Sequence, residues 1–151
     1  MLTTAEALEK VLAAMPVLAA EAAEVSAATG RILRQTVVAE RDQPPFDRVM
    51  MDGIALAHAD LAAGTTSLPI QCTQMAGEPA RHLEAGKAIE IMTGASLPVG
   101  ADCIVPVERI TIDGGVAVLE DGYVAEVRQF IHPRASDHAQ GSELLAPGKR
   151  I

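Results

Sequence analysis

The stretch ITIDGGVAVL, residues 110–119, carries the strongest local structural signal in the chain. Two short runs rich in β-branched residues flank Gly114 and Gly115. Such runs form strands, and a Gly-Gly pair supplies the positive φ angles of a two-residue hairpin turn. The stretch therefore predicts a β-hairpin and indicates a β-rich middle of the chain.

Further β-type runs lie upstream of the hairpin, each between turn signals. The clearest of them are residues 67–75, 88–92 and 103–107. Ahead of these runs, Pro44-Pro45 excludes regular helix and favours an extended segment. Residues 55–62 have room for one short helix. Together these patterns predict a β-rich region over residues 41–138.

The N-terminal segment has helical character instead. Thr3 and Glu6 are spaced as a capping box, and apolar residues then follow at helical spacing. Pro16 ends or kinks this helix, because proline lacks the backbone donor that a helix interior needs. Residues 19–29 also have helical propensity, although residues 24–26 could equally form a short strand.

Composition and charge exclude several classes of protein. Hydrophobic residues make up 49% of the chain and aromatic residues 2%. A chain so rich in aliphatic residues is not disordered, and one so poor in aromatic residues lacks the rings on which single-stranded nucleic acids stack. A net charge of −8 without any basic run repels duplex DNA and anionic membranes. We therefore expect neither a nucleic-acid partner nor a membrane partner.

Two features predict a cytoplasmic location. Cys72 and Cys103 fit neither a CxxC motif nor a disulfide-rich scaffold, which is typical of free thiols in a reducing compartment. The apolar run over residues 11–20 imitates a signal peptide, but acidic rather than basic residues dominate ahead of it and Pro16 interrupts it. The run is also too short to span a bilayer.

Asp52-Gly53 is a first candidate site. Gly53 would let the chain turn tightly and expose the Asp52 carboxylate. A carboxylate in that position could hold Mg²⁺, which takes one or two carboxylates together with substrate oxygens. The alternative is an ordinary Asp-Gly turn, in which the acid bonds its own backbone.

Thr93-Gly94-Ala95 is a second candidate, because it follows a predicted strand and consists of small residues. Successive backbone N–H groups in such a loop can form an anion nest, with the Thr93 hydroxyl as a further donor. The alternative is a plain exit from strand to turn.

The polar residues near the end of the chain give weaker signals. Asp137-His138 beside Arg134 could be catalytic, and a solvated polar turn is the alternative. The histidines are scattered without cysteines at zinc-binding spacing, so we assign no metal ligands.

Taken together and in order, the motifs of this chain resemble the molybdopterin molybdenumtransferase (MoeA) family, which includes the E domain of gephyrin. The segments that carry the resemblance are Gly30-Arg31-Ile32-Leu33, Pro45-Phe46-Asp47, Met51-Asp52-Gly53-Ile54-Ala55, Ala76-Gly77-Glu78-Pro79, Ile91-Met92-Thr93-Gly94-Ala95 and Pro98-x-Gly100-Ala101-Asp102. Their order and spacing over nearly the whole chain make the resemblance specific.

The resemblance implies an α+β fold of modular construction. N-terminal helices and a partial α/β domain would be formed by residues 1–40 with 139–151, and an inserted β-rich domain by residues 41–138. A nucleotide-site domain and a small β domain would follow, so we expect a fragment that is inactive alone. Members of the family form homodimers, here through the α/β domain, with an active cleft shared between protomers.

The resemblance also implies a reaction, the insertion of molybdate into adenylylated molybdopterin, with release of AMP and assistance from Mg²⁺. This step belongs to molybdenum cofactor biosynthesis. By their positions in the motifs, the implied catalytic residues are Asp52, Thr93 and Asp137. The residues implied to bind the pterin are Gly53, Gly94 and Ala95. Molybdate and the pterin phosphate are both anions, so a chain of net charge −8 needs a cation and hydrogen-bond donors at this site.

Departures from the family pattern cluster at the expected site. Arg48-Val49-Met50 lacks the hydroxyl that the family carries ahead of Met-Asp-Gly. The segment 130–137 lacks the family's Gly and Glu, and His132 stands where an arginine is usual. An alternative follows, a diverged non-catalytic paralogue that acts as a pterin-binding or assembly module.

Overall fold

The computed structural model describes residues 2–151, which fall into two units. The first unit takes the chain as far as Val37 together with Glu143–Ile151, and the second unit is Val38–Ser142. Most of the regular structure is β-sheet, and the helix content is low.

The helix of the first unit is α1 (Thr4–Ala14). Thr3 and Glu6 form the predicted capping box: Thr3 Oγ1 accepts from the Glu6 amide at 3.3 Å, and the Glu6 carboxylate accepts from the Thr3 amide at 2.7 Å. The helix ends just ahead of Pro16, as predicted. None of its residues is buried.

Residues 19–29 form neither the predicted α-helix nor the alternative strand at residues 24–26. The regular structure in this segment is one 3₁₀ turn, η1 (Val25–Ala27). Short helices in proteins depend on packing an apolar face, and the Val25 side chain is 90% exposed. Both predictions are therefore wrong, because the residue that would anchor a helix or strand here stays in solvent.

The C-terminal residues complete the first unit. β1 (Val37–Val38) and β10 (Glu143–Leu145) form a two-stranded sheet. The chain then turns at Pro147-Gly148, and the Leu33 amide donates to the Lys149 carbonyl at 2.8 Å. One helix and these short pairings do not make an α/β domain, so the partial α/β domain stays a prediction.

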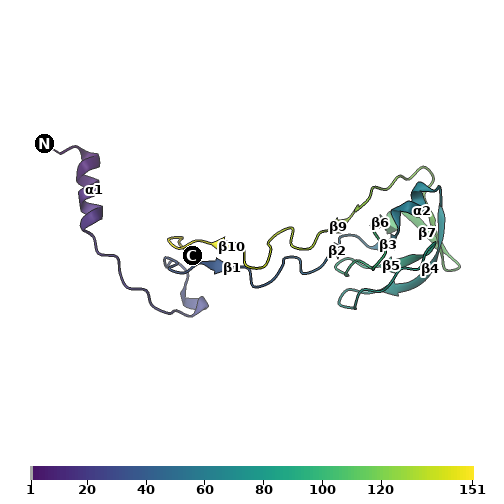
Figure 1. Cartoon of the computed structure of the whole chain (residues 1–151), viewed down its shortest axis with the longest axis horizontal. Coiled ribbons are helices and arrows are strands. Elements are labelled where there is room, and N and C mark those ends of the chain that lie inside the picture. The colour runs from purple at the N-terminus through teal and green to yellow at the C-terminus, as the bar shows by residue number, and fades with distance from the viewer. Residues whose placement is uncertain (1) are drawn as a thin grey trace. The chain divides into compact units, whose positions relative to one another are not determined.

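The second unit holds a six-stranded sheet in the order β6-β3-β5-β4-β8-β7 (Figure 1). Its strands are β3 (Gly53–Leu56), β4 (Ser67–Gln74), β5 (Ala88–Ile91), β6 (Cys103–Pro106), β7 (Ile110–Asp113) and β8 (Val116–Leu119). β4 and β5 run parallel, and the other neighbouring strands run antiparallel. The predicted strands at 67–75, 88–92 and 103–107 are confirmed as β4, β5 and β6, each ending one residue earlier than predicted.

β7 and β8 form the predicted hairpin, with Asp113 paired to Val116 across the turn. Gly114 and Gly115 have φ angles of 55° and 79°, which a two-residue turn of this kind requires. Because β8 also pairs with β4, the hairpin extends the sheet and β7 becomes one of its edges.

The short helix predicted within residues 55–62 is confirmed, although it occupies only the second part of that range. Residues 53–56 form β3, and α2 (His58–Ala62) begins only afterwards. β3 lies between β5 and β6, and its residues Ile54, Ala55 and Leu56 are fully buried. A central strand covered on both faces is apolar throughout, so it lacks the alternation that identifies a half-exposed strand. The remaining short elements are η2 (Val107–Arg109), β2 (Arg48–Val49) and β9 (Ile131–His132).

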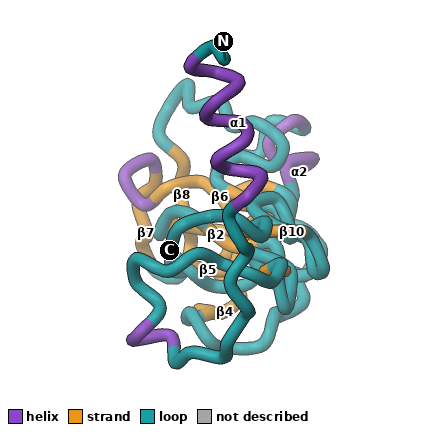
Figure 2. Tube along the Cα trace, turned by 90° about the vertical axis from the view of Figure 1, so that its left-hand side faces the viewer, coloured by secondary structure: helices purple, strands orange, loops and turns teal. Residues whose placement is uncertain are grey.

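The core of the second unit lies on both faces of the sheet, whose strands are orange in Figure 2. Ile54 and Val105 belong to one buried cluster, whereas Ala55 and Ile104 belong to the other. Neighbouring residues of a strand point to opposite faces, so β3 and β6 contribute to both clusters. Aliphatic side chains make up most of both, in accord with the low aromatic content. Within residues 2–151, neither helix has the length and apolarity needed to cross a membrane.

Candidate functional site

Asp52 lies directly ahead of β3, where Gly53 determines the path of the backbone. Gly53 has a φ of 156°, and a Cβ atom there would lie 2.0 Å from the Val105 carbonyl oxygen. Only glycine allows so close an approach to β6. The Asp52 carbonyl accepts from the Val107 amide at 2.9 Å. The backbone at Asp52 is therefore fixed against β6, while its side chain is exposed to solvent.

Thr93 holds the Asp52 carboxylate with two hydrogen bonds. The Thr93 amide and the Thr93 hydroxyl both donate to Asp52 Oδ1, at 2.7 and 2.6 Å. The hydroxyl, and after it the amide, lowers the pKa of the Asp52 carboxyl, because both bonds favour its charged form. The structure thus brings together two of the predicted site residues, although 41 positions separate them in the chain.

The loop that carries Thr93 uses its own amides internally. The Gly94 amide donates to the Val49 carbonyl at 2.9 Å, and the Ala95 amide to the Met92 carbonyl at 3.0 Å. With the Thr93 amide bonded to Asp52, the successive amides of the loop are all occupied. The predicted anion nest is therefore not formed in this structure, and pterin binding by Gly94 and Ala95 stays a prediction.

Asp137 belongs to a different cluster. It accepts from His132 Nε2 at 2.9 Å, and His132 Nδ1 lies 3.0 Å from Nη2 of Arg48. Arginine can only donate, so Nδ1 of His132 accepts and Nε2 carries the proton that points to Asp137. Arg48 and His132 are cross-strand partners in the β2–β9 pair. No hydrogen bond within the described part of the chain joins Asp137 to Asp52 or Thr93.

Within the described residues, the hydrogen bonds of Arg134 go to residues other than Asp137. Its Nε donates to Asp42 at 2.6 Å, and its amide donates to Asp47 at 2.8 Å. Asp47 also accepts from Nη2 of Arg128 at 2.8 Å. The Arg134 amide, and after it Arg128, lowers the pKa of the Asp47 carboxyl. These contacts fasten the residues on both sides of the double proline, Asp42 and Asp47, to the segment that carries His132.

The backbone of that second segment is unusual. Arg128, Phe130 and Ala135 have φ angles of 62°, 54° and 59°, a region that side-chain-bearing residues seldom adopt. Such residues persist where the surrounding contacts hold them, and they gather at functional sites. Residues with strained backbone angles thus lie on both sides of His132 in the chain. We therefore include this segment in the candidate site.

Sequence reasoning missed the supporting residues of the site. Asp47 has one local signal, its place directly after Pro-Pro-Phe. Asp42, Arg48 and Arg128 have none, because their partners lie more than 80 positions away in the chain. Contacts so distant in sequence leave no periodic pattern.

The described residues could supply some, but not all, of the ligands of a Mg²⁺ ion. Among residues 2–151, no three His, Cys, Asp or Glu side chains gather in a way that could hold a metal ion. Both Thr93 bonds end on Asp52 Oδ1, which leaves Oδ2 to other partners. Mg²⁺ commonly takes one or two protein carboxylates and completes its shell with water and substrate phosphates. An exposed Asp52 carboxylate meets that requirement.

Comparison with known proteins gives one consistent answer. A family profile described as "MoeA N-terminal region (domain I and II)" matches residues 2–151. The "Molybdopterin molybdenumtransferase" of Synechocystis sp. is 34% identical over 152 residues, which cover 100% of this chain and 39% of that protein. The protein of the same name from Synechococcus elongatus is 37% identical over 127 residues, which cover 80% of this chain and 31% of that protein.

The fold is similar to that of solved structures. A molybdopterin biosynthesis moeA protein from Pyrococcus horikoshii OT3 superposes with a TM-score of 0.73 at 30% identity. The match covers 83% of this chain and 34% of that one. The chain therefore spans about two fifths or less of the length of these relatives. On these matches and on its ordered motifs, the chain belongs to the MoeA family and corresponds to the N-terminal region of its members.

Proposed function

We propose that this chain serves molybdenum cofactor biosynthesis, as the N-terminal region of a molybdopterin molybdenumtransferase. The whole enzyme would insert molybdate into adenylylated molybdopterin and release AMP. Family membership and the names of the relatives support the proposal. The observation that carries it is the Asp52–Thr93 pair, in which two motif residues hold an exposed carboxylate in its charged form. This chain alone would be inactive, since it covers 39% of such a relative.

Asp52, Thr93 and Asp137 are proposed as the catalytic residues of this region. Asp52 would present its Oδ2 to the substrates, while Thr93 fixes its Oδ1. Asp137 would act as a second carboxylate, oriented by the His132 ring. Mg²⁺, when bound, would neutralise charge between these carboxylates and the phosphate and molybdate anions. Of the small residues Gly53, Gly94 and Ala95, Gly94 is half-buried and the other two are buried, so Gly94 is where the pterin would approach the backbone closely.

Assembly and location follow the same proposal. The exposed apolar side chains of α1 support a homodimer formed through residues 1–40 with 139–151, because such a face is stabilised by a partner. Free thiols at Cys72 and Cys103 fit the reducing cytoplasm.

The test is restoration of molybdoenzyme activity by the whole protein in cells that lack the endogenous transferase. Asp52→Asn keeps the shape of the side chain but removes its charge, and Thr93→Val removes the hydroxyl. We expect activity to fall by about 100-fold or more for Asp52→Asn, the scale of a lost charged catalytic group. Thr111→Val is the matched control, because Thr111 is exposed on β7. Full activity of Asp52→Asn would refute the assigned role.

A second candidate function is a non-catalytic pterin-binding or assembly module. One observation favours it: His132 stands where the family has an arginine, and both of its ring nitrogens are engaged within the chain, by Arg48 and Asp137. Calorimetry with a pterin ligand on the whole protein, combined with turnover measurement, separates the two. Tight binding without turnover favours the module, and tight binding with turnover favours the enzyme.

A further inference from the structure

Gln74 is the one polar side chain that is fully buried in the described part of the chain. It lies at the last position of β4 and has no exposed surface. A buried amide without hydrogen bonds destabilises a fold, because its polar atoms lose their bonds to water. The partners of Gln74 therefore indicate what the side chain does.

The Gln74 amide connects two loops. Its Nε2 donates to the Ser96 carbonyl at 2.7 Å and lies 3.3 Å from the Ser96 hydroxyl. Its Oε1 accepts from the Arg81 amide at 2.9 Å. One side chain thus holds the loop after β5, which carries Thr93, and the segment after β4, which carries Arg81.

The loop of residues 92–96, here called the Thr93 loop, is also held by elements other than β4. Asp52 accepts two bonds from Thr93, and Val49 of β2 exchanges bonds with Gly94 and Ala95 at 2.9 Å each. Gln74 supplies the support from β4, where Ser96 is the contact. The loop is thereby held by two sets of bonds, one at Thr93, Gly94 and Ala95 and the other at Ser96.

We propose that Gln74 is a positioning residue that sets the place of the Thr93 loop and, through it, the Asp52–Thr93 pair. It does so by clamping Ser96 from the buried end of β4 and by holding the Arg81 segment against the same loop. The consequence for catalysis rests on the proposed function, whereas the positioning itself does not.

Gln71 gives a matched control within the same strand. It also uses its whole amide: Nε2 donates to the His82 carbonyl at 2.9 Å, and Oε1 accepts from the Glu84 amide at 2.9 Å. These partners lie on the segment after β4 and not on the Thr93 loop. Gln71→Met therefore removes two side-chain bonds from β4, against three for Gln74→Met, without touching Ser96.

The experiment is amide hydrogen exchange by NMR on this chain without ligand. In Gln74→Met, the amides of Thr93 and Gly94 should exchange about tenfold faster than in the parent, as the loss of a buried hydrogen bond predicts. The amide of Leu119, which donates to Thr66 at 2.9 Å on the far hairpin, is the internal reference and should not change. In Gln71→Met, Thr93 and Gly94 should keep the parent rate.

Unchanged exchange at Thr93 and Gly94 in Gln74→Met would overturn the proposal, and so would equal acceleration in Gln71→Met. If Gln74→Met does not fold, the test is made on the side-chain amide of Gln74 in the parent chain. Its Nε2 protons should be protected from exchange and close to Ser96. Exchange of these protons at the solvent rate would refute the role. In the whole enzyme, a positioning role also predicts a lower kcat with little change in KM. If the whole protein had no transferase activity, the proposed function would be wrong, but the positioning role measured by hydrogen exchange would be unaffected.

Discussion

At Asp52, two hydrogen bonds from one residue decide how the carboxyl titrates. Thr93→Val removes the hydroxyl donor and leaves the amide donor, so the pKa of Asp52 should rise toward its ordinary value without reaching it. A depressed pKa stabilises the fold above the ordinary Asp range, and that stabilisation is lost as pH falls through the pKa of the folded state. Parent and Thr93→Val should therefore differ in stability at neutral pH and converge in acid.

NMR titration of the Asp52 carboxyl carbon measures this shift, and Thr93→Ser is the control because it keeps both donors. The same Asp52 pKa in Thr93→Val and in the parent would contradict the hydrogen-bond account.

At the scale of elements, the close contact between β3 and β6 depends on Gly53. Gly53→Ala would bring a Cβ atom to 2.0 Å from the Val105 carbonyl oxygen, so the two strands could not keep their pairing. We expect the free energy of unfolding to fall by at least about 2 kcal/mol. Gly86→Ala is the control, because Gly86 also has a positive φ, of 69°, but no atom lies within 4 Å of its added Cβ. Chemical denaturation measures both variants, and equal losses would refute the role of the contact.

The elements also explain how far sequence reasoning reached. The hairpin at residues 110–119 and the capping box at Thr3 were predictable because the partners in each lie a few positions apart. β3 was not, because a strand buried on both faces has no alternating pattern and its alanine favours a helix by propensity. Asp52 and Thr93 were each recognisable as a turn or loop residue. Their bond was not, because 41 positions separate them.

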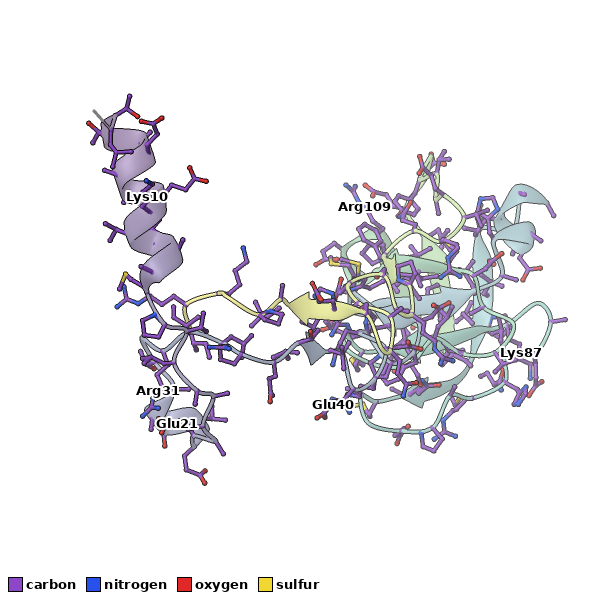
Figure 3. The ribbon with its side chains drawn as sticks, turned by 60° about the vertical axis from the view of Figure 1, so that its left-hand side comes forward. Lys10, Glu21, Arg31, Glu40, Lys87 and Arg109 are labelled. Carbon is purple, nitrogen blue, oxygen red and sulfur yellow. The ribbon has the colours of Figure 1, made fainter. Side chains whose placement is uncertain are left out.

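At the scale of the whole molecule, the two units differ in burial. Both buried clusters consist of residues of the second unit, whereas no described residue of the first unit is buried. The ion pair of Arg31 and Glu21 in the first unit, labelled in Figure 3, is exposed and adds little stability. The second unit should therefore fold by itself.

Removal of residues 1–37 and 143–151 tests this difference. The remaining segment, 38–142, should unfold cooperatively with a Tm close to that of the whole chain, because the buried apolar area is retained. Circular dichroism during heating measures both. A segment 38–142 that lacks a cooperative transition would show that the first unit contributes to the core after all.

The central claim is that Asp52, held by Thr93, belongs to the catalytic site of a molybdenumtransferase. The most direct measurement is molybdate-dependent release of AMP from adenylylated molybdopterin by the purified whole protein, with Mg²⁺ present. We predict release by the parent protein and by Thr111→Val, and a rate lower by about 100-fold or more for Asp52→Asn. AMP release by Asp52→Asn at the parent rate would contradict the claim.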